Sequence, residues 1–277
     1  MKLIVTLATA LVATSLAADD QALQRAIDGN HRIAEHKARD QYRHPAQTLE
    51  FFRIKPGQTV VEITPGSWQW YTEILAPYLG KSGTLYAASG QTEPFQPTEE
   101  MLSKLNEEQR KMALARAKQK LPIIQKFEKH PKVFANAKLV KFNPFEDVLD
   151  VPAGSADRVL TFRNVHSWTG QPGGGEKAFA LFAKALKPGG LLGVVEHRAD
   201  KASGQGYVTV SDVVKLAEGA GFRLIDTSEV NANPKDSKDY ARGVWALPPR
   251  LWANDGNNEK YIAIGESDRM TLLFEKL

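Results

Sequence analysis

Residues 59–66 read TVVEITPG, and this stretch decides the fold of the chain. Its first five residues are apolar or β-branched apart from Glu62, which is typical of a buried strand. The turn Thr64-Pro65-Gly66 ends that strand, and residues 71–79 predict a helix. Residues 83–88 then predict a second strand. A strand, a helix and another strand in this order form the unit of a parallel sheet covered by helices.

The same alternation continues along the rest of the chain. Five more strands are predicted, at residues 138–142, 156–162, 191–196, 222–230 and 270–275. Helices are predicted at residues 176–186 and 211–219. We therefore expect an α/β fold with a doubly wound, mostly parallel, seven-stranded sheet of the Rossmann-like type. No helix is predicted between the last two strands, so one of them is expected to run antiparallel.

Residues 19–277 are expected to form a single domain in which three segments are added to this alternation. The first is a helical N-terminal flank that begins with an amphipathic helix over residues 22–41. The others are a helical insertion over residues 94–135 and a loop insertion over residues 231–264.

The helical insertion is predicted to contain one long charged helix over residues 98–121, which ends at Pro122. Met101, Leu105 and Met112 lie on one side of that helix. Because burial stabilises an apolar stripe, we expect the helix to pack on the main body. A solvated helical arm is the alternative.

The beginning of the chain indicates export. Lys2 is followed by an apolar stretch to Leu16, and Ser15-Leu16-Ala17 has the small-x-small pattern of a cleavage site. Residues 1–18 therefore predict a signal peptide, because a spanning helix needs about 20 apolar residues. An uncleaved anchor is the alternative. We expect an exported, periplasmic protein with no stable membrane insertion after cleavage. The chain has no cysteine, which excludes a disulfide framework.

The composition is that of an ordinary globular protein. The chain has 277 residues, of which 42% are hydrophobic and 25% charged, and this mixture excludes disordered and collagen-like proteins. The net charge of +4 arises from 36 basic and 32 acidic residues that are scattered along the chain. Nucleic-acid-binding proteins gather their basic residues on one face. We therefore expect a small-molecule partner and no nucleic acid, and the composition does not distinguish a monomer from an oligomer.

Polar side chains follow the ends of three predicted strands. In doubly wound sheets, ligands bind outside the carboxyl ends of the strands, so these side chains are expected to share a cleft. They are Glu62, Pro65, Gly66, Ser67 and Trp68, then Arg163, Asn164, His166 and Trp168, and finally Glu196, His197 and Arg198.

His166 is the candidate general base of this cleft, because imidazole is the side chain best suited to proton transfer near neutral pH. A core histidine bonded to a backbone carbonyl is the alternative. Glu196 would orient the imidazole or act as the base itself. Arg163 and Arg198 could bind an anionic group with their planar donors, and ion pairs with Glu196 or Asp200 are the alternative.

Two further side-chain sets have a structural alternative. Tyr71 and Trp168 could stack on a ligand or face a cation, although burial in the core is the commoner outcome for aromatic residues. A metal site of His166, Glu196 and His197 is not expected, because adjacent residues of a strand point to opposite faces.

Several segments of the chain resemble class I S-adenosylmethionine-dependent methyltransferases, and more closely an exported bacterial group of predicted methyltransferases. The segments are residues 60–66, 70–77, 160–166, 186–190, 194–200, 231–236 and 265–270. The resemblance implies S-adenosylmethionine as the cofactor and methyl transfer to a small or envelope acceptor. For such a reaction the residue types discussed above assign the catalytic roles to His166, Glu196 and Arg163. The cofactor-binding residues that it implies are Glu62, Pro65, Gly66, Ser67, Tyr71, Asn143 and Asn164.

The chain departs from this family at three places. The family has a Gly-x-Gly-x-Gly turn after the first strand, where this chain has Thr64, Gly66 and Trp68. The second strand is not followed by the acid that binds the ribose, and the nearest acid is Glu93. Asn143 stands where an aspartate is frequent. Together with export, these departures favour the alternative function: an exported small-molecule-binding protein, or an enzyme of other chemistry, that keeps the fold without the methyl-donor site.

Overall fold

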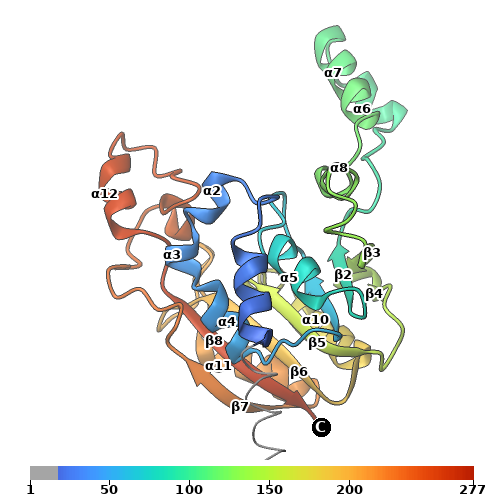
Figure 1. Ribbon diagram of the computed structural model, residues 1–277. Helices are drawn as coiled ribbons and strands as arrows, with labels where there is room; N and C mark the ends of the chain where they lie inside the picture. Colours follow the sequence, from blue (N-terminus) through green and yellow to red (C-terminus); the bar gives the residue numbers. More distant parts are fainter. Residues whose placement is uncertain (1–17) are drawn as a thin grey trace, which may run out of the picture.

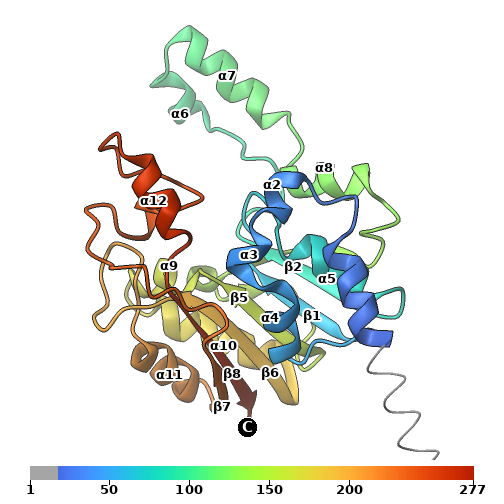
Figure 2. The same cartoon turned by 60° about the vertical axis from the view of Figure 1, so that its left-hand side comes forward.

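The computed structural model describes residues 18–277, whose centre is a sheet of eight strands with helices on both faces (Figures 1 and 2). The strands are β1 (Thr59–Ile63), β2 (Thr84–Ser89), β3 (Ala137–Asn143), β4 (Val148–Leu149), β5 (Ala156–Phe162), β6 (Leu186–His197), β7 (Phe222–Ser228) and β8 (Arg269–Lys276). The predicted α/β fold is confirmed. The sheet has one strand more than expected, because the two residues of β4 fold back antiparallel onto β3.

The strands follow the order β4-β3-β2-β1-β5-β6-β8-β7 across the sheet. Strands β1, β2, β3, β5 and β6 are parallel. Strand β8 runs antiparallel to both β6 and β7, as expected where no long helix separates two strands. The chain leaves β1 toward β2 on one side, and β5 lies on the other side. The gap between the carboxyl ends of β1 and β5 is therefore the switch point at which doubly wound sheets bind ligands.

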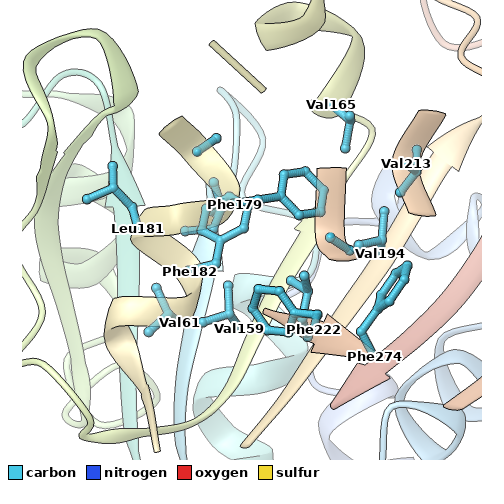
Figure 3. Packing of buried hydrophobic residues seen from close by; sticks show 14 of the residues in the cluster. Val61, Val159, Val165, Phe179, Leu181, Phe182, Val194, Val213, Phe222 and Phe274 are labelled. Atoms are coloured by element: carbon cyan, nitrogen blue, oxygen red, sulfur yellow. The ribbon is translucent and has the colours of Figure 1, made fainter. Parts of the chain in front are cut away.

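Each strand contributes to a core on either side of the sheet, because successive side chains alternate between the two faces. Val61 packs in the first core, whereas Val60 packs in the second. Figure 3 shows the first core, in which Phe179 and Phe182 lie between helix α10 (Gly174–Ala185) and the strands. Full burial of such a side chain contributes about 1.5–3 kcal/mol.

Eight further helices flank the sheet or lie in the segments inserted between its strands. They are α2 (Ala34–Lys37), α3 (Asp40–Arg43), α4 (Pro45–Phe51), α5 (Thr72–Leu79), α8 (Pro122–Lys129), α9 (Val165–Thr169), α11 (Val210–Gly219) and α12 (Asn258–Ile264), with short 3-10 turns η1 (Pro144–Glu146) and η2 (Gly243–Ala246). Helix α11 shares the first core with α10, whereas α4 and α5 share the second core.

The N-terminal flank differs from the single helix that was expected over residues 22–41. Residues 18–27 are helical, the chain then turns, and α2 and α3 follow as separate short helices. The turn begins at Asp28-Gly29-Asn30, three residues that favour turns over helix interiors. A Cβ atom at Gly29 would lie 2.3 Å from the His31 ring, so the close approach of that ring requires glycine.

The helical insertion between β2 and β3 also differs from the prediction. The helix expected over residues 98–121 is divided into α6 (Glu99–Ser103) and α7 (Glu107–Ala117), because Asn106 caps a new helix together with Gln109. Both helices stand clear of the sheet in two views (Figures 1 and 2), and the side chain of Met112 is 58% exposed. The expectation that this segment packs on the main body is therefore wrong. The apolar residues of α7 do not gather on one face, so burial has little to stabilise.

The chain between β7 and β8 rises on the same side of the molecule as α6 and α7 (Figure 2) and contains η2 and α12. It has a small core of its own, which includes Tyr240, Leu247 and Tyr261. Within residues 18–277 no helix has the length and apolar character needed to cross a membrane. The predicted signal peptide lies outside the described residues, apart from residue 18.

Candidate functional site

A cavity of about 1280 Å³ opens at the carboxyl ends of β1, β5 and β6, where the switch point was expected. The loops that follow these three strands form much of its wall, and the segments before α11 and around η2 close it. Eight of the ten residues assigned to catalysis or cofactor binding line it: Glu62, Pro65, Gly66, Ser67, Tyr71, Arg163, Asn164 and His166.

The end of β1 places a buried carboxyl group at the cavity. Glu62 is 2% exposed, and Thr72 Oγ1 donates a hydrogen bond of 2.5 Å to its Oε2. Burial raises the pKa of Glu62 to about 7, although the bond from Thr72 opposes this rise. The protonated form is therefore populated near neutral pH, and in that form the group can donate a hydrogen bond as well as accept one.

The loop after β1 holds one glycine in a conformation that glycine favours. Gly66 has a φ of +70°, and among residues 18–277 no atom beyond its two chain neighbours lies within 4 Å of the position that a Cβ would take. The indole of Trp68 forms part of the cavity wall, and its ring stacks 6.0 Å from the ring of His36. The Arg39 guanidinium lies 5.4 Å from the same indole. Trp68 therefore packs against the N-terminal flank and leaves the cavity open.

A partly exposed histidine and a fully buried glutamate form a pair at the ends of β5 and β6. His166 Nδ1 lies 3.0 Å from Glu196 Oε1, and Glu196 is fully buried directly behind the imidazole. Glu196 also accepts hydrogen bonds from the backbone N–H groups of Val165, at 2.5 Å, and His197, at 2.8 Å. Because a carboxylate can only accept hydrogen bonds, we assign the proton of the neutral imidazole to Nδ1, which leaves Nε2 to accept a proton.

His197 completes this corner of the cavity. Its Nδ1 lies 2.5 Å from Ser267 Oγ, and its ring centroid is 5.4 Å from that of His166. Burial lowers the pKa of His197 well below its usual value, and the neighbouring His166 and arginines lower it further. The imidazole is therefore neutral at pH 7.

The side chains of His166, Glu196 and His197 meet, contrary to expectation, with ligand atoms within 4.8 Å of one another. They meet because β6 ends at His197 and α9 brings His166 over that end. The geometry still does not favour a metal ion. Both oxygens of Glu196 already accept hydrogen bonds, and the arginine side chains nearby would repel a cation.

Four arginines surround a single buried glutamate at the edge of the cavity. Glu266 accepts hydrogen bonds from Arg43 Nε at 3.1 Å and Arg269 Nη1 at 3.0 Å. Arg163 Nη1 lies 3.5 Å from Glu266, and Arg39 also donates to it. Burial alone would raise the pKa of Glu266, but the four guanidinium groups lower it to about 2. We call these five residues the arginine cluster.

Sequence reasoning selected Arg163 for this site but missed Arg39, Arg43 and Glu266. The first two precede β1 in the N-terminal flank, and Glu266 directly precedes β8. The only sequence signal was the run of charged residues before the last strand.

Several other predicted residues take structural positions. Asn143 does not line the cavity, because its side chain accepts from the Phe145 N–H and caps η1. Arg198 pairs with Glu229 and Asp268 rather than with Glu196 or Asp200.

The two aromatic candidates differ in their surroundings. Trp168 packs in the first core against Phe142, with ring centroids 5.5 Å apart. Tyr71 is 4% exposed and stacks on Phe162 at 3.6 Å, yet it contributes to the cavity wall.

The ends of β2 and β3 are separate from this cavity. Residues 90–93 border a different, shallow hollow together with Phe95 and Lys141. Ser89 ends β2, so no carboxylate occupies that strand end.

No family model matches the chain, and no curated protein matches it. Among solved structures, it is similar to an S-adenosylmethionine-dependent methyltransferase from Aquifex aeolicus. The identity is 18%, the TM-score is 0.54, and 87% of this chain and 93% of that chain are covered.

Two further solved structures are similar over most of their length. A putative sarcosine dimethylglycine methyltransferase from Galdieria sulphuraria has 12% identity and a TM-score of 0.53, with 87% of each chain covered. The (4+2)-cyclase SpnF has 13% identity and a TM-score of 0.54, with 95% of each chain covered. At such identities the likeness is one of fold. The chain therefore has the Rossmann-like fold that is found in S-adenosylmethionine-dependent methyltransferases.

Proposed function

We propose that the protein transfers a methyl group from S-adenosylmethionine to a small molecule bound in the cavity. One observation carries this proposal: the loop after β1 and His166, which is paired with the buried Glu196, line the same cavity at the switch point of the sheet. Ligand sites in proteins commonly occupy about 300–1,000 Å³. A cavity of about 1280 Å³ leaves room for a donor and an acceptor together.

The residues at β1 and β5 fit one end of S-adenosylmethionine. The open backbone at Gly66 allows a ligand to approach closely, and Ser67 and Glu62 offer hydrogen-bonding groups beside it. Asn164 Nδ2 donates 2.9 Å to the Ile63 carbonyl and so ties the ends of β5 and β1 together. We assign these residues, with Pro65 and Tyr71, to the cofactor. Asn143, which caps η1, has no free role there.

When bound, S-adenosylmethionine supplies an electrophilic methyl group, whose bond to sulfur breaks with the electron pair staying on sulfur. The lone pair of the acceptor oxygen or nitrogen forms the new bond to the methyl carbon, while His166 Nε2 accepts the proton of that hydroxyl or amine. Glu196 holds the imidazole and stabilises the imidazolium that results. Arg163 positions the acceptor in the same cavity. Such positioning supplies much of the rate of a displacement between two bound reactants.

Calorimetric titration with S-adenosylhomocysteine tests donor binding. The wild type is expected to give a saturable heat. Gly66→Val is expected to weaken binding, because its side chain enters the open space beside the loop. Gly154→Val is the matched control, since Gly154 has a similar φ of +64° and open surroundings but lies outside the cavity. No heat and no thermal shift with the wild type at millimolar ligand would overturn the proposal.

A second measurement tests the base. Release of S-adenosylhomocysteine in the presence of a periplasmic small-molecule extract is expected to be lost in His166→Ala while the variant stays folded. A variant that is folded and fully active would contradict the role of His166. A variant that is inactive because it has unfolded would assign His166 to packing.

A different chemistry on the same fold is the second candidate function. Two observations favour it: no carboxylate ends β2, and Asn143 is engaged in a cap. SpnF, a cyclase by its description, has a similar fold. Mass spectrometry of the small molecule that copurifies with the protein distinguishes the candidates, because a nucleoside supports methyl transfer and any other compound supports the alternative.

We also propose that the protein is exported and processed near Ala17. The N-terminal pattern of residues 1–18 supports this proposal. N-terminal sequencing of the protein from a periplasmic fraction is expected to begin near Ala18. Recovery of a chain that retains Lys2 would contradict it.

A further inference from the structure

The arginine cluster carries more positive charge than its single glutamate balances. Four guanidinium groups surround one carboxylate, which leaves three positive charges in excess. The side chains of Arg43 and Arg269 are 2% and 4% exposed. Because an unpaired buried charge is costly, a cluster of this kind is better stabilised when an anion joins it.

Two arginines have donors that the protein does not use. Arg43 Nη1 is buried and has no hydrogen-bond partner within residues 18–277, although Arg43 lines the cavity. The Arg163 side chain makes one hydrogen bond in the same part of the chain, at 3.5 Å to Glu266. The Arg163 side chain is 23% exposed, so its unused N–H groups are available at the cavity wall. Arg43 adds its positive charge beside them, while its unpaired Nη1 is buried and its guanidinium carbon lies 4.7 Å from the Trp70 ring centroid.

The backbone of Arg163 indicates that its position is imposed by the fold. Its φ is +63°, in the left-handed region that non-glycine residues seldom adopt. Such a conformation costs on the order of 1–3 kcal/mol and persists only where the surrounding structure imposes it. Burial, together with the charge of Arg43, lowers the pKa of Arg163 to about 9, which leaves the guanidinium protonated at neutral pH.

We propose that Arg43 and Arg163 bind an anionic group, a carboxylate or a phosphate, of the molecule held in the cavity. The planar donor fork of arginine matches the oxygens of both groups. His166 lines the same cavity, and its neighbour His197 is close enough for its pKa to be affected by Arg43 and Arg163. With His166 as the base proposed above, the molecule bound there carries an anionic group in addition to the hydroxyl or amine that His166 deprotonates. The hydroxyl or amine of the bound molecule rests on the proposed function, whereas the anion site at Arg43 and Arg163 does not.

The experiment measures the thermal shift that inorganic phosphate and succinate cause at constant ionic strength. Both probes are expected to raise the melting temperature of the wild type. Arg163→Gln is expected to bind them about tenfold more weakly, because it loses a charged hydrogen bond. Arg223→Gln is the matched control, since Arg223 is 63% exposed and pairs with Glu275 on the surface.

A second variant keeps the test decisive if Arg163→Gln does not fold. Arg163→Lys retains the charge without the planar fork, and it is expected to bind the probes with intermediate affinity. Equal shifts in the wild type and in a folded Arg163 variant would overturn the inference. So would the absence of any shift in the wild type.

Two nucleosides distinguish the sources of the anion. S-adenosylhomocysteine carries a carboxylate, whereas 5′-methylthioadenosine lacks one. If Arg163→Gln weakens binding of the former alone, the arginines bind the donor's carboxylate. If it weakens binding of phosphate and succinate but of neither nucleoside, they bind the acceptor. If the wild type binds phosphate and succinate but not S-adenosylhomocysteine, the anion site stands and methyl transfer is refuted. If it binds S-adenosylhomocysteine but neither phosphate nor succinate, methyl transfer stands and the anion site is refuted.

Discussion

Replacing Glu62 by glutamine is expected to change how the stability of the protein depends on pH. Burial raises the pKa of Glu62 from 4.5 to about 7. Between these two values the folded protein keeps a proton that the unfolded chain has released, so the free energy of unfolding falls as the pH rises. At about 1.36 kcal/mol for each pH unit, this group removes about 3 kcal/mol of stability between pH 4.5 and pH 8.

Glu62→Gln abolishes this contribution, because glutamine does not titrate and still accepts the hydrogen bond from Thr72. Urea unfolding of both proteins between pH 4.5 and pH 8 measures the effect. The stability of the variant relative to the wild type is expected to rise by about 3 kcal/mol across this range. Glu218→Gln, on the exposed side of α11, is expected to show no comparable trend. Parallel stability curves for Glu62→Gln and the wild type would refute the buried, protonated carboxyl group.

Three further changes test the packing and the site. Glu196→Gln turns an amide N–H toward backbone donors that now meet a carboxylate, and it is expected to lower the free energy of unfolding by about 1–3 kcal/mol in urea. The control Glu146→Gln, at an exposed position, should cost under about 0.5 kcal/mol. Equal costs would contradict the pairing. Gly193→Ala places a Cβ 2.8 Å from core side chains and should lower the free energy of unfolding by about 1–3 kcal/mol. Gly219→Ala meets open space and should be neutral or stabilising. The reverse order would refute the core packing. Replacing residues 98–117 with a short Gly/Ser linker should leave the melting temperature within about 2 °C of the wild-type value, because α6 and α7 stand clear of the sheet. A larger drop would show that α6 and α7 pack on the rest of the domain.

The strands were predictable because their signals are local. The apolar runs at β1 and β5 are bounded by turn residues, and their predicted limits agree with the structure at both ends. The flank was less predictable, because the apolar spacing of residues 22–41 continues through Asp28-Gly29-Asn30, where the backbone turns. In the insertion between β2 and β3, the composition of residues 98–121 predicts one continuous helix, but Asn106 caps a new helix and so divides it.

The site was predictable only where strand ends determine it. His166 and Glu196 follow two neighbouring parallel strands, so the topology brings them together. The arginine cluster joins residues far apart in sequence, since Arg43 and Glu266 are separated by 223 positions. No local pattern indicates such a contact, because it depends on how the N-terminal flank packs beside the start of β8. For the same reason, sequence alone did not show that Asn143 would be used as a cap.

A crystal structure of the protein with S-adenosylhomocysteine tests the account most directly. The account predicts ligand density in the cavity, beside Glu62 and Gly66, with the sulfur atom on the side of His166 Nε2. Density for the nucleoside in the hollow bordered by Gly90 and Lys141, or an empty cavity at saturating ligand, would contradict it.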